Sequence, residues 1–209
     1  MVEPTVAWRR PSKRGAATPL VVLLHGFGAD EHDLIDLASE LPRQFAYAGV
    51  RAPIELPEGG YSWFADRGLR RPVPASLQST VDMLRAWLDS SATADYDRKR
   101  TFVLGFSQGM ATAAALLLDD PARLAGAVLL SGSIAVDLGT ATPNRLAGVP
   151  VFTAHGSFDS VILPDRIAQS LQYLRERSGA ELSEHTYPID HSISRREIAD
   201  IAAWLEERG

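Results

Sequence analysis

Continuously apolar runs alternate with amphipathic stretches along this chain from Leu20 onward. Four of the runs, which begin at residues 20, 101, 126 and 149, have the composition of parallel strands buried on both faces. Val6–Trp8 adds a candidate antiparallel edge strand. The six main strand predictions are Leu20–Leu24, Tyr47–Arg51, Thr101–Phe106, Gly126–Leu130, Val149–Ala154 and Leu182–Tyr187.

Four stretches between these runs place apolar side chains at i, i+3 or i+4, and i+7, with charged residues on the opposite face, which predicts amphipathic helices. Asp30 before the first, and Ser192 or Ser194 before the last, are candidate N-caps. The alternation of strand and helix indicates the α/β class: a mostly parallel sheet with right-handed crossovers and helices on both faces. The apolar positions are Leu34, Leu37, Ala38 and Leu41; Leu77, Val81, Leu84 and Leu88; Ile167, Leu171 and Leu174; and Ile198, Ile201, Ala202 and Leu205.

Composition narrows the function classes. The chain has 209 residues without an internal repeat or an evident linker, so we expect a single domain over 1–209. A net charge of −5 argues against a nucleic-acid partner. The absence of cysteine excludes disulfides, thiolate zinc sites and a cysteine nucleophile. The sequence begins without a basic-then-apolar signal pattern and has no segment of membrane-spanning length, so we expect a cytoplasmic protein without stable membrane insertion.

The pattern Gly-x-Ser-x-Gly at 105–109 carries the strongest chemical signal. An apolar strand pattern ends at Phe106, and a helical pattern with Met110 and Ala114 on one face follows at once. A serine at such a sharp strand-to-helix turn is exposed above the sheet edge and faces the N-terminus of the helix. An ordinary βα turn of small residues is the plain alternative. The flanking strand and helix favour Ser107 as the nucleophile of a serine hydrolase.

A serine nucleophile needs a base and a carboxylate that orients the base. In this architecture they follow the serine in the order acid, then histidine, in loops after later strands. Asp159 and His191 occupy these places. Asp165, in the first turn of a predicted helix, and Asp190, beside the histidine, are weaker candidates for the acid.

The other histidines at strand ends have better structural explanations. His25 precedes the serine, so the chain order is wrong for the base, and we expect it to brace the turn that follows the first central strand. His155 lies in a tight βα turn, where a structural role is also expected. No pair among His25, His155 and His191 has the helical i, i+4 spacing of metal ligands, so we predict no metal site and no cofactor.

The same architecture suggests where an oxyanion hole and an acyl site lie. The backbone N–H groups of Gln108, after the nucleophile, and of Phe27, in the glycine-rich turn after the first strand, are the expected oxyanion donors. A long irregular segment from about Ala52 to Pro74 carries several aromatic residues, and loops of this length are usually functional or disordered. We expect the apolar wall for the acyl chain to contain Trp63, Phe64, Val161 and Ile162, although exposed aromatics here also suit a homodimer interface.

Four motifs in order resemble those of one family: residues 24–30 (Leu-His-Gly-Phe-Gly-Ala-Asp), 105–110 (Gly-Phe-Ser-Gln-Gly-Met), 155–161 (His-Gly-Ser-Phe-Asp-Ser-Val), and His191 with Ile198–Leu205 behind it. Together they resemble the small carboxylesterase/acyl-protein thioesterase family of α/β-hydrolases, also called phospholipase/carboxylesterase. The resemblance covers nearly the whole chain. It implies an α/β-hydrolase fold without a large cap domain and without a cofactor.

The resemblance also implies residue roles. Ser107, Asp159 and His191 match the family's catalytic triad, and Phe27 and Gln108 match its oxyanion positions. The expected activity is hydrolysis of small-molecule carboxylic esters with short to medium acyl chains, through an acyl-enzyme intermediate.

Three alternative functions remain open. An acyl-thioesterase or a lysophospholipase would use the same triad, and a non-catalytic binding protein could keep the same pocket. A dehalogenase or epoxide hydrolase is disfavoured, because those relatives have Asp where this chain has Ser107.

The family usually has Gly before the catalytic histidine, whereas this chain has Asp190, which could raise the basicity of the imidazole or point to solvent. Trp63 matches an aromatic near the family's acyl site.

Overall fold

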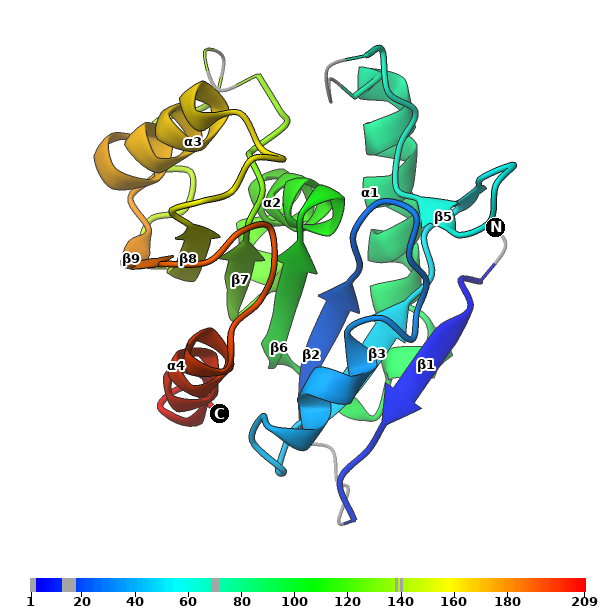
Figure 1. The fold of residues 1–209 in the computed structure, drawn as a ribbon. Helices are drawn as coiled ribbons and strands as arrows, with labels where there is room; N and C mark the ends of the chain where they lie inside the picture. Colours follow the sequence, from blue (N-terminus) through cyan, green and yellow to red (C-terminus); the bar gives the residue numbers. More distant parts are fainter. Residues whose placement is uncertain (1–2, 13–17, 69–71, 138, 140) are drawn as a thin grey trace.

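The computed structural model describes residues 3–12, 18–68, 72–137, 139 and 141–209. Its centre is a seven-stranded sheet in the order β1-β3-β2-β6-β7-β8-β9 (Figure 1). The pairing is parallel throughout except at the edge, where β1 runs antiparallel to β3. The strands are β1 (Val6–Arg9), β2 (Thr18–Leu24), β3 (Ala46–Val50), β6 (Tyr96–Phe106), β7 (Gly126–Leu130), β8 (Pro150–Gly156) and β9 (Glu181–Tyr187).

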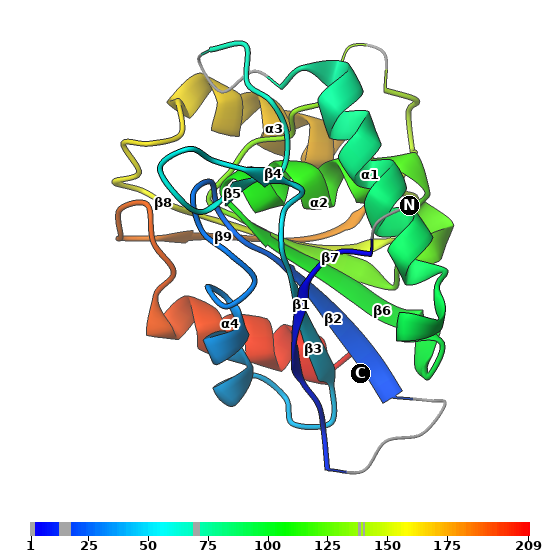
Figure 2. The ribbon, with the colours of Figure 1, turned by 90° about the vertical axis from the view of Figure 1, so that its right-hand side faces the viewer.

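Helices cover both faces of the sheet (Figure 2). On one side lie α1 (Pro74–Leu88), α2 (Gln108–Asp119) and α3 (Pro164–Glu176), and on the other lie α4 (Arg195–Glu206) and a short 3-10 helix, η1 (Ile35–Ser39). Two further single-turn 3-10 helices, η2 (Ser91–Thr93) and η3 (Pro121–Arg123), connect the larger elements. The predicted α/β architecture, a mostly parallel sheet with helices on both faces, is thereby confirmed, and so is the antiparallel edge strand at Val6–Trp8.

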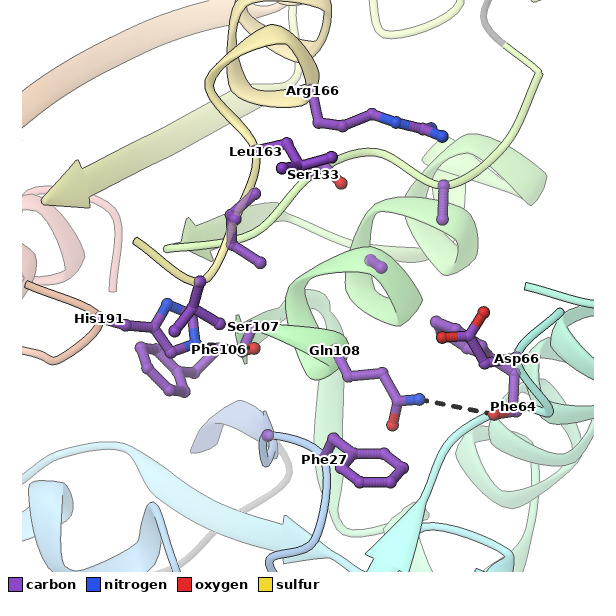
Figure 3. Close-up of a pocket in the computed structure, with 15 residues that line it drawn as sticks. Phe27, Phe64, Asp66, Phe106, Ser107, Gln108, Ser133, Leu163, Arg166 and His191 are labelled. Carbon is purple, nitrogen blue, oxygen red and sulfur yellow. Dashed lines mark hydrogen bonds between the residues drawn. The ribbon is translucent and has the colours of Figure 1, made fainter. Parts of the chain in front are cut away.

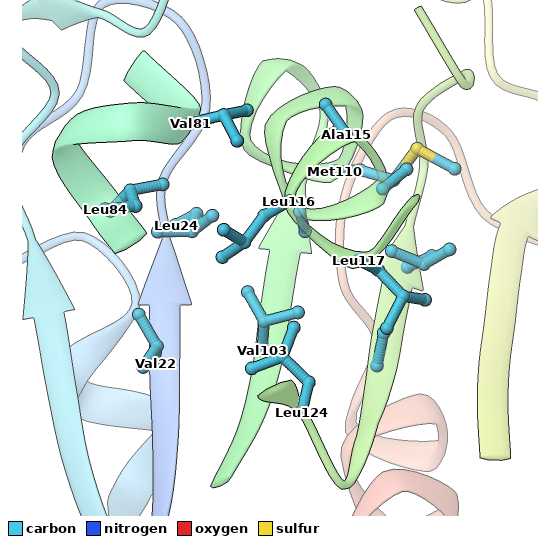
Figure 4. Packing of buried hydrophobic residues seen from close by; sticks show 14 of the residues in the cluster. Val22, Leu24, Val81, Leu84, Val103, Met110, Ala115, Leu116, Leu117 and Leu124 are labelled. Carbon is cyan, nitrogen blue, oxygen red and sulfur yellow. The ribbon is translucent and has the colours of Figure 1, made fainter. Parts of the chain in front are cut away.

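Successive strand residues point to opposite faces and enter two separate cores. In β2, Leu20, Val22 and Leu24 pack with α1 and α2, whereas Val21 and Leu23 pack with η1 and α4. All seven residues of β2 are buried, which explains why its residues Leu20–Leu24 are apolar without alternation. Figure 4 shows the first core, where Leu24 and Val103 lie between the sheet and the helices.

The α-helix predicted between the first two main strands is not found, and this is the largest difference between the predicted and the observed fold. The positions Leu34 to Leu41 contain only the 3-10 helix η1. Asp30 does not cap it, because its Oδ1 accepts the backbone N–H of His32, 2.8 Å away. Glu31 is buried and forms two hydrogen bonds with Arg51 of 2.6 and 2.5 Å. These contacts hold the start of the segment in an irregular turn, which leaves too little chain for an α-helix.

The aromatic-rich segment after β3 is folded onto the protein. It contains a short antiparallel ribbon of β4 (Ile54–Glu55) and β5 (Tyr61–Ser62), and its residues 69–71 lie outside the described residues. Trp63 and Phe64 are buried, and Tyr61 is half-buried beneath the guanidinium of Arg51, 4.6 Å from the ring centroid. The exposed aromatics that would have suited a homodimer interface are therefore not found here.

Within the described part of the chain, no helix is long and apolar enough to cross a membrane.

Candidate active site

Ser107 lies on a strained turn between β6 and α2, with φ of 56° and ψ of −114°. This region is rarely occupied by residues other than glycine, so the surrounding structure must hold the serine there. A Cβ atom on Gly105 would overlap the carbonyl oxygen of Gly109, and one on Gly109 would overlap that of Leu24. Both glycines are therefore required for the turn to form.

His191 connects Ser107 to Asp159 by two hydrogen bonds. Its Nε2 lies 2.9 Å from Ser107 Oγ, and its Nδ1 lies 2.8 Å from Asp159 Oδ2. Because an ionised carboxylate only accepts, Nδ1 carries the proton and Nε2 can accept the serine hydroxyl. The three residues come from loops after β6, β8 and β9, at the carboxyl ends of these parallel strands. Figure 3 shows His191 beside Ser107.

The carboxylate of Asp159 is buried and fixed from two sides. Its Oδ1 accepts the backbone N–H groups of Val161 and Ile162, at 2.8 and 3.0 Å, and its Oδ2 accepts from His191. Burial alone would raise the pKa of Asp159, but these three hydrogen bonds and the nearby imidazole hold it below its ordinary value. Asp159 is therefore ionised at neutral pH and can stabilise a positive charge on the imidazole.

The two weaker acid candidates lie elsewhere. Asp165 is exposed in the first turn of α3, where a carboxylate complements the helix dipole. Asp190 is exposed, and its Oδ1 accepts from the hydroxyl of Ser192 at 2.7 Å. Asp190 is thus exposed to solvent, one of the two possibilities expected for it.

His25 supports the turn that carries Phe27. Its Nε2 accepts the backbone N–H of Ala52 at 3.1 Å, so its Nδ1 donates to the carbonyl of Gly26, 2.7 Å away. Burial lowers the pKa of His25, which favours this neutral form. The structural role expected for His25 is confirmed.

Two backbone N–H groups are available beside Ser107. Gln108 is the first residue of α2, so its N–H has no acceptor within the helix. In the described part of the chain, the N–H of Phe27 likewise has no protein acceptor. Both residues line the same cavity as Ser107. The N–H of the next residue, Gly28, is bonded to the carbonyl of Tyr61 at 2.9 Å, which holds the turn in place.

A cavity of about 420 Å³ opens beside Ser107 and His191, within the range typical of small-molecule sites. Three of the four residues predicted for the acyl wall, Phe64, Val161 and Ile162, line it. Leu163, the next residue along the chain, lines it as well. The side chain of Gln108 points toward Phe64 (Figure 3). The arrangement can bind an apolar acyl or alcohol group next to a serine hydroxyl.

Comparison with known proteins identifies the family of this chain. A profile of the family described as Phospholipase/Carboxylesterase matches residues 11–208. The chain belongs to this family. Its members and structural neighbours include named carboxylesterases, so the protein is a hydrolase enzyme of the carboxylesterase type.

Two relatives illustrate the range of family members. The Bacillus subtilis (strain 168) protein MhqD, named as a hydrolase, is 29% identical over 198 residues, which is 93% of this chain and 96% of that protein. Acyl-protein thioesterase 1 of Yarrowia lipolytica is 29% identical over 222 residues, which is 98% of this chain and 97% of that protein.

Solved structures of the family share the fold. The Bacillus cereus carboxylesterase superposes with a TM-score of 0.86 at 25% identity, covering 99% of this chain and 95% of that one. A carboxylesterase from Mesorhizobium loti gives a TM-score of 0.81 at 26% identity, over 91% of this chain and 89% of that one.

Of the four residues predicted for the acyl wall, Trp63 is the one that does not line the cavity beside Ser107. It is fully buried behind the site, where its indole N–H donates to the carbonyl of His25 at 2.8 Å. Its backbone N–H donates to Oε1 of Gln108 at 2.9 Å, while Nε2 of Gln108 donates to the hydroxyl of Ser62. The prediction that Trp63 contacts the acyl chain is wrong; Trp63 instead fixes the loop that carries Phe64.

Sequence reasoning missed several lining residues. Ala111 lies one helical turn after Ser107 and could have been found from the period of α2. Ser133, Asp66 and Arg166 line the cavity as well, but no sequence pattern marks them. No cluster of three or more potential metal-ligating side chains occurs among the described residues.

The loop that carries His191 is anchored by a buried carboxylate at the start of α4. Ser194 and Glu197 form a capping box, in which Glu197 Oε2 accepts the backbone N–H of Ser194 at 3.3 Å. Glu197 is fully buried and its Oε1 has no hydrogen-bond partner. Burial raises the pKa of Glu197 to about 7, from an ordinary value of 4.5.

The first prediction follows from this shift. Between pH 4.5 and about 7, the folded protein binds a proton at Glu197 that the unfolded chain does not, so stability falls as the pH rises. We expect Glu197→Gln, which cannot ionise, to reduce the loss of unfolding free energy between pH 5 and pH 8 by about 2–3 kcal/mol. Urea unfolding at both pH values measures this change.

Glu207 supplies the control, because its side chain is exposed beyond the end of the same helix. Glu207→Gln should leave the pH dependence of the wild-type protein unchanged. Equal pH dependence in Glu197→Gln and the wild type would mean that Glu197 is already ionised at pH 5.

Proposed function

We propose that this protein hydrolyses carboxylic esters of short to medium acyl chains, with Ser107 as nucleophile, His191 as general base and acid, and Asp159 as the residue that orients His191. The observation that carries the proposal is the continuous hydrogen-bond chain from Asp159 through His191 to Ser107, which ends at the apolar cavity. Serine hydrolysis requires this order of contacts.

The reaction has two halves. As Ser107 Oγ attacks the ester carbonyl carbon, Nε2 of His191 takes the hydroxyl proton, and the backbone N–H groups of Phe27 and Gln108 stabilise the oxyanion. The ester C–O bond then breaks, and His191 protonates the leaving alcohol. Water, deprotonated by His191, attacks the acyl group on Ser107. Collapse of the second intermediate releases the acid and returns the proton to Ser107.

The lining of the cavity supports a preference for modest acyl chains. Phe64, Val161, Ile162 and Leu163 offer apolar contacts. Leu163 is more than half exposed, so this wall ends at the surface and does not enclose a long chain. Thioester hydrolysis by the same residues is the second candidate, because a relative of matching length is named acyl-protein thioesterase 1.

The second prediction tests both the chemistry and the nucleophile. We expect p-nitrophenyl esters from acetate to palmitate to be hydrolysed with a maximum at short or medium chains. A fluorophosphonate should label the protein once, at Ser107, and Ser107→Ala should abolish the labelling. Turnover by absorbance and the modified peptide by mass spectrometry are the measurements.

Ser133 provides the matched control, since it also lines the cavity but forms no hydrogen bond with His191. Ser133→Ala should be labelled like the wild type. Folded protein that neither reacts with fluorophosphonate nor cleaves any ester would instead favour a non-catalytic binding protein. Labelling at Ser107 with turnover of acyl thioesters alone would favour the thioesterase.

A further inference from the structure

Arg166 brings a positive charge to the wall of the apolar cavity. It lies in the first turn of α3, is half-buried, and lines the cavity together with Leu163 and Ser107. Figure 3 shows its side chain extending from α3 across the cavity, with the guanidinium group turned away from His191. The charge is thus separated from the reacting atoms by apolar surface.

The guanidinium of Arg166 has no acceptor among the described residues: no hydrogen bond, ion pair or ring contact of its side chain is found there. Other half-buried arginines are paired; Arg51 bonds to Glu31 and Arg123 to Asp89 and Asp120. The other described arginines without a partner are all exposed, namely Arg9, Arg43, Arg67, Arg195 and Arg196. A guanidinium that lines a cavity and has no protein acceptor keeps its donors available to a ligand that supplies an acceptor.

The space around Arg166 is large enough for an extended substrate. A second hollow of about 610 Å³ runs along α3 and shares Arg166 and Ala135 with the first cavity. It is lined by polar side chains of α3, including Gln169 and Gln172. A ligand with its ester at Ser107 and an apolar spacer in the first cavity would therefore place its far end beside Arg166.

The charges in the cavity favour one negative charge on such a ligand. Among the described lining residues, Arg166 is the only permanent cation and Asp66 is the carboxylate on the opposite wall. One guanidinium matches one carboxylate by two parallel hydrogen bonds.

We propose that Arg166 is a specificity-determining residue that selects esters carrying a carboxylate several atoms from the scissile carbonyl, such as half-esters of dicarboxylic acids. The proposal rests on the proposed ester hydrolysis by Ser107. In it, Arg166 binds the distal carboxylate and takes no part in proton transfer, so it acts on substrate choice and not on the chemical step.

The third prediction compares matched substrates: mono-4-nitrophenyl glutarate, with a distal carboxylate, and 4-nitrophenyl pentanoate, without one. A second pair, 4-carboxyphenyl pentanoate and phenyl pentanoate, places the charge on the alcohol side instead. For at least one pair, Arg166→Gln should lower kcat/KM for the anionic ester about tenfold and for the neutral ester less than about twofold. The loss should appear mainly in KM.

Arg43→Gln is the control, because Arg43 is exposed and lies before β3, at the opposite end of the sheet from Ser107. It should leave every ratio unchanged. Equal losses for anionic and neutral esters in Arg166→Gln would overturn the proposal and indicate a structural role. If neutral esters are cleaved through Ser107 but Arg166→Gln alters neither ratio, this inference alone fails. If no ester is cleaved, the proposed function fails and this inference with it.

Discussion

Replacement of His191 by alanine should lower kcat/KM for a short p-nitrophenyl ester by about 10⁴-fold or more, the scale on which removal of a triad member acts in serine hydrolases. The expected loss follows from the position of the ring, which is 2.9 Å from Ser107 Oγ on one side and 2.8 Å from Asp159 on the other. Without it, nothing removes the serine proton during attack or protonates the leaving alcohol. Steady-state kinetics at neutral pH measures the loss.

His155 is the appropriate control for this substitution. It also lies at the carboxyl end of a central strand, but its Nε2 contacts Thr186 Oγ1, at 3.4 Å, and not Ser107. His155→Ala should retain near-wild-type activity. Circular dichroism must show that both variants are folded. Retention of more than a tenth of the wild-type kcat/KM in folded His191→Ala would exclude His191 as the base.

The central strands were predictable because strands that are buried on both faces consist mainly of consecutive apolar residues. β2 and β7 are covered on both faces, so every position is buried. The predicted run Gly126–Leu130 coincides with β7, and Leu20–Leu24 lies within β2, which begins two residues earlier at Thr18. The helices α1, α3 and α4 each bury one stripe, which the spacing of their apolar residues reveals. The segment before β3 has the same spacing but forms only η1, because the ion pair of Glu31 with Arg51 and the Asp30 turn take up its first residues.

The site was predictable where function depends on chain order and local geometry. Ser107 is marked by the glycines that its turn requires, and Asp159 and His191 by their places after β8 and β9. The cavity wall depends on side-chain direction, which the sequence does not encode locally. Trp63 and Phe64 are neighbours with similar chemistry, yet Trp63 is buried behind the site and Phe64 lines it. Arg166 lines the cavity because α3 lies beside it, and no local sequence pattern predicts that arrangement.

Substitution of Gly109 by alanine should destabilise the protein by about 3 kcal/mol, at the upper end of the cost of overpacking a core. Alanine normally favours a helix interior, so helix propensity alone predicts the opposite sign. Here the new methyl would overlap the carbonyl oxygens of Leu24 and His25, and both belong to backbone that cannot rotate away. Relief requires α2 to move off β2, which also displaces Ser107. Urea unfolding measures the free energy, and ester hydrolysis should fall together with it.

Gly26→Ala separates this steric effect from a general cost of replacing glycine near the site. The nearest atom to a Cβ on Gly26 is a ring carbon of Phe106 at 3.4 Å, an ordinary contact with a side chain that can adjust. Its cost in unfolding free energy should stay below about 1 kcal/mol. If Gly109→Ala proved as stable as Gly26→Ala, α2 would have to tolerate a shift at its first turn. The tight approach of the helix to β2 would then not be what holds Ser107 in its strained conformation.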